Sequence, residues 1–206
     1  MLETKLDIAS GIRLWPSALD TQTQRDLIAE IYARVDDAPF YRPVMPKTAK
    51  PFSVEETNLG PLGWISDARG YRYDATHPLT GKPWPAIPRL LFDIWDQATN
   101  NAPPPQCCLV NLYREAAKMG LHQDRNENAM NVPVLSVSLG DDALFRIGGT
   151  SRKGPTKSVR LRSGDVLTFG GSARLAFHGI DRIIPGTSGL VPGGGRINLT
   201  LRRVVP

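Results

Sequence analysis

Two segments in the N-terminal half of the chain carry apolar residues with the period of an α-helix. The first is residues 21–35, which Thr21 or Thr23 can cap, and the second is residues 87–98, with Pro88 in its first turn. The apolar positions of the first are Leu27, Ile28, Ile31, Tyr32 and Val35. Those of the second are Leu90, Leu91, Ile94 and Trp95. The stretch between them, NLGPLGWISDARGYRYD, is rich in turn residues and predicts irregular structure.

The pattern changes after the proline-rich segment 102–106, which is typical of a stiff connector. Short apolar runs then alternate with turn residues and predict strands. The runs are CCLVNLY, PVLSVSLG, ALFRIGG, SVRLR, DVLTFGG, RLAFHGI and RINLTLRR. Such a series is typical of a β-sandwich or jelly roll, and Ser163-Gly164-Asp165 predicts a hairpin turn within it. We divide the chain into an N-terminal part, 1–102, and a C-terminal core, 103–206, within one compact unit.

Composition narrows the class of protein. The chain is 41% hydrophobic and 22% charged, enough for a packed core, and it contains no apolar run of the roughly 20 residues that a membrane helix needs. Adjacent Cys107 and Cys108 argue against a disulfide framework and for the cytoplasm. The net charge of +5 is compatible with a solubilising surface and equally with a polyanionic partner such as nucleic acid.

Candidate chemistry lies in LHQDRNE, at the entrance to an apolar strand. In an extended chain His122 and Asp124 project to the same face, and His178 follows on a later strand. Two histidines and one carboxylate leave open positions on an octahedral ion, which suits non-haem Fe(II). The same ligands also bind zinc, and the simplest alternative is that these histidines are satisfied core residues.

The last predicted strand alternates apolar and polar residues. Its polar positions are Arg196, Asn198, Thr200 and Arg202. They predict either a solvated face of the sheet or a polar pocket in which arginines hold a dicarboxylate. Asn111 and Tyr113 alternate in the same way and could add hydrogen bonds from a neighbouring strand.

An ordered series of motifs from about residue 58 to residue 203 resembles the AlkB family of Fe(II)- and 2-oxoglutarate-dependent dioxygenases. The motifs are NLGPLGW, GYRY, GKPWPAIP, CLVNLYREAAKMGLHQD, PVLSVSLGDDALFRIGG, SGDVLTFGGSARLAFHGI and RINLTLRR. The resemblance implies a mainly β fold with flanking helices (α+β). Its core would be a double-stranded β-helix, a jelly roll, and its N-terminal part would form a nucleotide-recognition lid.

The resemblance also implies the role of each site residue. The catalytic residues and iron ligands would be His122, Asp124 and His178. The 2-oxoglutarate pocket would contain Asn111, Tyr113, Arg196, Asn198 and Arg202. The substrate-binding residues would be Trp64, which stacks on the base opposite His122, with Tyr71, Tyr73, Asn126 and Arg152. Well-known repair enzymes of the family carry an acid where Asn126 stands, so the base preference is open. Trp84 we interpret as structural.

The implied function is oxidative demethylation of N-alkylated bases, such as 1-methyladenine and 3-methylcytosine, preferably in single-stranded DNA. The enzyme would use Fe(II), 2-oxoglutarate and O₂ and would release succinate, CO₂ and formaldehyde. We expect a monomer whose partner is nucleic acid and which does not bind a membrane. The alternatives are the same chemistry on RNA or protein, a non-catalytic nucleic-acid-binding β-domain, and a zinc hydrolase.

Overall fold

The computed structural model describes residue 2 and residues 5–206, and within them the protein is mainly β, with antiparallel sheets and two α-helices. The helices are α1 (Thr21–Val35) and α2 (Arg89–Thr99), with a short 3₁₀ turn, η1 (Gly171–Ala173). The strands before the connector are β1 (Leu6–Ala9), β2 (Ile12–Trp15), β3 (Glu55–Leu59), β4 (Gly63–Asp67) and β5 (Gly70–Asp74). Those after it are β6 (Cys107–Tyr113), β7 (Met119–His122), β8 (Val134–Gly140), β9 (Asp142–Ile147), β10 (Lys157–Leu161), β11 (Val166–Phe169), β12 (His178–Ile184) and β13 (Arg196–Arg202).

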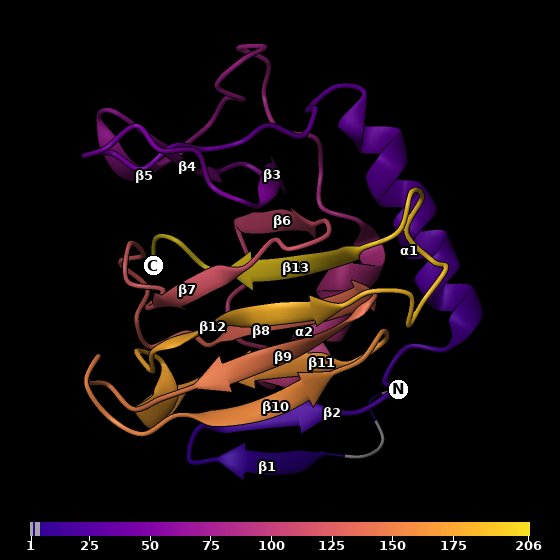
Figure 1. Ribbon diagram of the computed structural model, residues 1–206, viewed down its shortest axis with the longest axis vertical. Helices are drawn as coiled ribbons and strands as arrows, with labels where there is room; N and C mark the ends of the chain where they lie inside the picture. The colour runs from indigo at the N-terminus through magenta and orange to yellow at the C-terminus, as the bar shows by residue number, and fades with distance from the viewer. Residues whose placement is uncertain (1, 3–4) are drawn as a thin grey trace.

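Two sheets pack face to face and a separate hairpin lies above them (Figure 1). The larger sheet has the order β1-β2-β11-β8-β13-β6-β3, and the smaller has the order β10-β9-β12-β7. Apolar side chains from both sheets, such as Leu167 and Phe169 from the larger and Phe145 and Ile180 from the smaller, form one buried cluster. The hairpin consists of β4 and β5.

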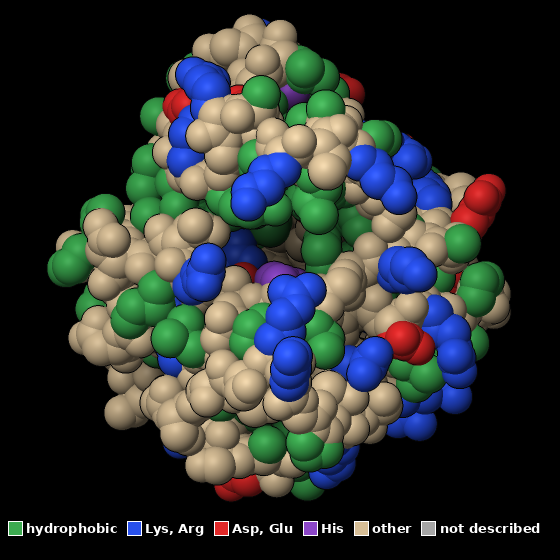
Figure 2. Space-filling model, turned by 60° about the vertical axis from the view of Figure 1, so that its left-hand side comes forward, with side chains coloured by type: hydrophobic (Ala, Val, Ile, Leu, Met, Phe, Trp, Pro, Cys, Tyr) green, Lys and Arg blue, Asp and Glu red, His purple; other side chains and the backbone are tan. Residues whose placement is uncertain are grey.

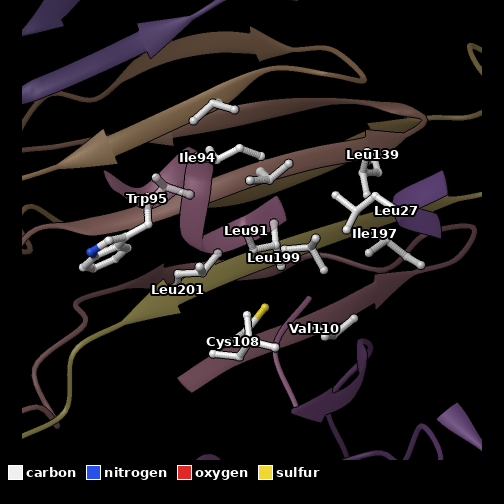
Figure 3. Close-up of a cluster of buried hydrophobic side chains, with 14 of the residues drawn as sticks. Leu27, Leu91, Ile94, Trp95, Cys108, Val110, Leu139, Ile197, Leu199 and Leu201 are labelled. Carbon is white, nitrogen blue, oxygen red and sulfur yellow. The ribbon is translucent and has the colours of Figure 1, made fainter. Parts of the chain in front are cut away.

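The other face of the larger sheet is covered by α1 and α2. Leu27 of α1 and Leu91 and Trp95 of α2 are buried against Leu199 and Leu201 of β13 (Figure 3). The helical periodicity of the sequence therefore reflects burial of one face of each helix against the sheet. No helix among the described residues is long and apolar enough to cross a membrane.

The two predicted helices are confirmed, with a different cap on the first. Asp20, and neither of the threonines considered, caps α1 by accepting a hydrogen bond from the backbone N–H of Thr23 at 2.7 Å. Pro88 is the N-cap of α2 and does not lie in its first turn. The strand-rich character of residues 103–206 is also confirmed, although the strand predicted in RLAFHGI begins only at His178.

The prediction of a hairpin at Ser163-Gly164-Asp165 is wrong, because the strands on either side of this turn do not pair with each other. The chain does reverse there, with Gly164 at φ +86°, but β10 before the turn pairs with β9 in the smaller sheet. The strand after it, β11, pairs with β2 and β8 in the larger sheet. Local turn chemistry predicted the reversal without indicating which sheet receives the next strand.

The region predicted to be irregular contains the end of β3 and all of β4 and β5 instead. β3 extends the larger sheet beyond β6, while β4 and β5 form the hairpin. The sequence of β3, EETNL, is polar but four of its five residues are buried, which no local pattern of apolar residues could indicate. β1, β2 and β3 are hydrogen-bonded into the same sheet as strands of the C-terminal core. The division at residue 102 stays a prediction.

Trp84 supports the hairpin from beneath, as its structural interpretation implies. Its indole Nε1–H donates to the carbonyl of Asp74 at 2.9 Å, and its ring packs against Ile65. Gly63 lies directly against this ring, so that a Cβ atom at that position would overlap the indole.

The substitution Gly63→Ala should therefore destabilise the protein by about 1–3 kcal/mol, because the buried indole cannot move without breaking its hydrogen bond. Gly154→Ala is the matched control, since nothing lies within 4 Å of a Cβ built there. Urea denaturation of both variants measures the difference, and an equal change in both would contradict the packing argument.

Candidate active site

The predicted ligands His122, Asp124 and His178 lie together between the two sheets. His122 at the end of β7 is directly opposite His178 at the start of β12, and their ring centroids are 4.5 Å apart. The Nε2 atoms lie 3.9 Å and 3.8 Å from the carboxylate oxygens of Asp124. One ligand atom from each residue lies within 4.8 Å of the other two, so the three could hold one metal ion.

Hydrogen bonds fix the orientation of both imidazoles. The Nδ1 atom of His122 lies 2.9 Å from the carbonyl of Gly120, and that of His178 lies 2.9 Å from the carbonyl of Ala176. A carbonyl can only accept, so each Nδ1 carries the proton and each Nε2 lone pair is free for a metal. Two imidazole nitrogens and a carboxylate are a donor set that fits Fe(II).

The charges around Asp124 favour its ionised form. Burial alone would raise the pKa of this carboxyl, but Arg202 and the two histidines outweigh it and hold the pKa below its usual value. Arg202 donates from Nη2 to Oδ1 of Asp124 at 2.8 Å. Burial and the neighbouring His122 lower the pKa of His178 to about 4. Both groups are therefore in the protonation state that metal binding requires.

A buried arginine that the sequence did not single out holds the loop that carries Asp124. Arg174 donates from Nη1 to the carbonyl of Asp124 at 2.6 Å and from Nε to the carbonyl of Val132 at 2.9 Å. Its Nη2 donates to Oε2 of Glu127 at 2.9 Å. Tyr73 of the hairpin donates its hydroxyl to the other oxygen of Glu127. Nothing local in the sequence indicates these long-range pairs.

The five residues predicted to bind 2-oxoglutarate lie on two paired strands. Asn198 is opposite Asn111, and Arg196 is opposite Tyr113, in the pairing of β13 with β6. Four of these residues line the central cavity: Asn111, Tyr113, Asn198 and Arg202. Arg196 is fully buried and is not part of the cavity lining. Arg196 donates to Ser138 at 2.6 Å and to the carbonyl of Asp141 at 3.2 Å, and burial lowers its pKa to about 10.

The predicted substrate residues form the upper wall and rim of the same cavity, with one exception. Trp64 and Tyr71 stack at 5.6 Å between ring centroids, and the Trp64 indole N–H donates to Asn126 at 3.4 Å. Arg152 lies over the ring of Phe177 at the rim. Tyr73 does not line the cavity, because its hydroxyl is directed to Glu127.

The cavity has a volume of about 480 Å³ and joins the histidine cluster to the aromatic wall. Figure 2 shows the hollow from outside, with a histidine side chain at its floor and lysine and arginine side chains around its mouth. A cavity of this size accommodates a small co-substrate together with part of a larger ligand.

A model of the 2OG-Fe(II) oxygenase superfamily matches residues 11–202. The fold and the site thus define an iron-dependent oxygenase that uses 2-oxoglutarate as co-substrate. The α-ketoglutarate-dependent dioxygenase AlkB homolog of Caulobacter vibrioides is 57% identical over 205 residues, which are 98% of this chain and 92% of that relative. The chain belongs to the AlkB family, and the resemblance predicted from the sequence is confirmed.

Two further comparisons agree. The α-ketoglutarate-dependent dioxygenase AlkB of Escherichia coli is 39% identical over 181 residues, covering 86% of this chain and 83% of that protein. The solved structure of OsALKBH1 matches with a TM-score of 0.82 at 32% identity, and covers 97% of this chain and 100% of that one. The protein is therefore an α-ketoglutarate-dependent dioxygenase whose cofactors are Fe(II) and 2-oxoglutarate.

The Arg174 contacts lead to a stability prediction. Arg174→Met should destabilise the protein by about 3–5 kcal/mol, because it leaves the buried carboxylate of Glu127 without the arginine that donates a hydrogen bond to it. Adding Glu127→Gln should recover part of that loss by removing the buried charge. Urea denaturation measures both, with the exposed Arg182→Met as control, which should change stability by less than about 0.5 kcal/mol. A double variant that loses the sum of the two single losses would contradict this pairing.

Proposed function

We propose that this dioxygenase removes methyl groups from N-alkylated bases in DNA, such as 1-methyladenine and 3-methylcytosine, with a preference for single strands. The observation that carries the proposal is that one cavity is lined by the histidine–aspartate cluster and also by Trp64 and Tyr71. A flat aromatic wall opposite a metal-binding cluster suits a base whose methyl group is the reacting part.

In this proposal His122, Asp124 and His178 hold Fe(II). Bound iron with 2-oxoglutarate and O₂ supplies the oxidising chemistry, which converts the N-methyl group to formaldehyde and the co-substrate to succinate and CO₂. The chain contributes fixed ligands. Arg174 holds the backbone of the Asp124 loop, and Arg202 holds its carboxylate, so the ligand set changes little on binding.

The 2-oxoglutarate would bind against β6 and β13. Two donors of Arg202, Nε and Nη1, make no hydrogen bond within the described residues. The same is true of Nε of Arg196. Buried donors of this kind are unfavourable unless a ligand pairs with them, and a dicarboxylate supplies the acceptors. Arg196 projects to the same face of β13 as Asn198 and Arg202 and would bind the distal carboxylate.

The two sheets would form a double-stranded β-helix core, and the hairpin of β4 and β5 would be the nucleotide-recognition lid. A base within a duplex cannot reach a cavity of this depth, so it must be flipped out or already be single-stranded. Trp64 is held in place because Asn58 bonds both its backbone N–H and its carbonyl at 3.0 Å. Arg125 and Arg152, exposed at the mouth of the cavity, would bind phosphates.

The buried thiols of Cys107 and Cys108, which form no disulfide, are compatible with the expected cytoplasmic location. The same chemistry on RNA is the alternative to the DNA function, and we expect the protein to be a monomer.

The first experiment is mass spectrometry of single-stranded DNA oligonucleotides that carry 1-methyladenine or 3-methylcytosine. With Fe(II), 2-oxoglutarate and O₂, the wild-type enzyme should remove the methyl group, and His122→Ala should abolish the reaction because one iron ligand is lost. Matched RNA and duplex oligonucleotides establish the strand preference, and size-exclusion chromatography establishes the oligomeric state. If succinate accumulates while every methylated base persists, the enzyme class holds and the proposed substrate is wrong.

A second prediction concerns Trp64. Stacking on a base is worth about 1–3 kcal/mol, so Trp64→Ala should raise the KM for methylated oligonucleotides by roughly 5- to 160-fold. Succinate formation without substrate should stay nearly constant, and Trp64→Phe should retain most of the affinity. Equal losses in both reactions would assign Trp64 to folding.

A further inference from the structure

Glu56 is a buried acid in the wall of the active-site cavity. It lies in the middle of β3, directly opposite Asn111 of β6, and its exposed fraction is 0%. Directly paired residues of an antiparallel sheet project to the same face, and both residues line the cavity. Its neighbour Glu55 projects to the opposite face of β3 and does not line the cavity. The carboxylate of Glu55 accepts a hydrogen bond from Arg42 at 3.1 Å.

Neither carboxyl oxygen of Glu56 has a hydrogen-bond partner among the described residues. The other two acids of the cavity lining are both bonded: Asp124 to Arg202, and Glu127 to Tyr73 and Arg174. A buried polar group without a partner is unfavourable, and within an active-site cavity it indicates a ligand. Burial raises the pKa of Glu56 to about 8, although the charge of Arg202 opposes this. A cationic ligand beside the carboxyl group would lower this pKa and favour the ionised form, which only accepts hydrogen bonds.

The chemistry of a carboxyl group restricts which ligand it can serve. 2-Oxoglutarate is a dianion, and it would be repelled by an ionised Glu56. A methyl group on N1 of adenine or N3 of cytosine makes the ring cationic and leaves an exocyclic amino group beside the methylated nitrogen. A hydrogen bond from that amino group to a carboxylate is charge-assisted and is about twice as strong as a neutral one. Guanine methylated at N1 and thymine methylated at N3 are neutral, and at C6 or C4, where the first two bases carry the amino group, they carry a carbonyl oxygen. The first pair is called amino-bearing and the second carbonyl-bearing, after the group at this position.

We propose that Glu56 is a specificity-determining residue, which accepts a hydrogen bond from the exocyclic amino group of the methylated base. It thereby favours cationic, amino-bearing bases over neutral bases that present a carbonyl group. The inference rests on the proposed function, and it adds a residue that selects among the methylated bases.

The test compares four single-stranded oligonucleotides of one sequence that carry 1-methyladenine, 3-methylcytosine, 1-methylguanine or 3-methylthymine. Wild type, Glu56→Gln, Glu56→Leu and the control Glu55→Gln are each assayed for kcat/KM by mass spectrometry. The readout is the ratio of kcat/KM for amino-bearing over carbonyl-bearing bases. This ratio is internal to each preparation, so a partly misfolded variant does not distort it.

Glu56→Gln keeps the shape of the side chain but offers a neutral amide that can donate as well as accept. It should lower the ratio about tenfold or more, and Glu56→Leu should also lower it, while Glu55→Gln leaves it unchanged. The KM for 2-oxoglutarate should stay within about twofold of wild type in all variants, as expected of a group that contacts only the base.

Three results would overturn the assignment. An unchanged ratio with an equal fall for all four bases would make Glu56 a packing residue. A selective rise in the KM for 2-oxoglutarate would place it in the co-substrate site. A wild-type enzyme that demethylates none of the four would refute the proposed function and the role of Glu56 together, whereas wild-type demethylation with an unaltered ratio in the variants refutes only the latter.

Discussion

The antiparallel pairing of β7 with β12 is the constraint on which the active site depends. It places His122 opposite His178 although the two residues are far apart in the sequence. The smaller sheet that contains this pair packs on the larger sheet, from which β13 sends Arg202 to the carboxylate of Asp124. The three candidate ligands therefore meet only when both sheets are formed and packed. This makes assembly of the site a consequence of the fold as a whole, and local structure alone cannot produce it.

Buried charge is balanced around this pairing by two arginines. Arg174 holds the carbonyl of Asp124, and Arg202 holds its side chain, so one residue is fixed from two directions. An ionised carboxylate in an apolar interior requires such partners, since isolated buried charges are strongly unfavourable. Arg174 also lies just before β12. The segment that leads into β12, the strand that begins with His178, thus also carries the arginine that binds the backbone of Asp124. The positions of these two ligands are therefore linked.

The sequence predicted those elements whose burial follows a simple period. The two helices and most strands from residue 107 onward bury apolar residues on one face or on both, so their patterns are visible locally. β7 (Met119–His122) is half-exposed and was not predicted as a strand. The His122–Asp124 spacing was informative for the same reason, because alternation in an extended chain is a local property. The cap of α1 depends on competition among near-equivalent residues. The sheet that receives the strand after Gly164, and the partners of Arg174, depend on contacts distant in sequence. Local patterns contain neither kind of information.

The polar sequence of β3 suggests an exposed segment, although the strand is buried beside the active-site cavity. EETNL reads as a surface segment, yet it is buried because the segment around Tyr41 is bridged to it and the hairpin lies next to it. Two of its buried polar side chains have structural partners: Thr57 donates to the carbonyl of Ala38, and Asn58 bonds the backbone of Trp64. Asn58 in this way ties the aromatic wall of the cavity to the edge of the larger sheet. A strand that served packing alone would favour apolar residues at these positions. Its polarity is explained if one side of β3 must face a polar ligand while the remaining polar groups hold the β4–β5 hairpin in place next to it.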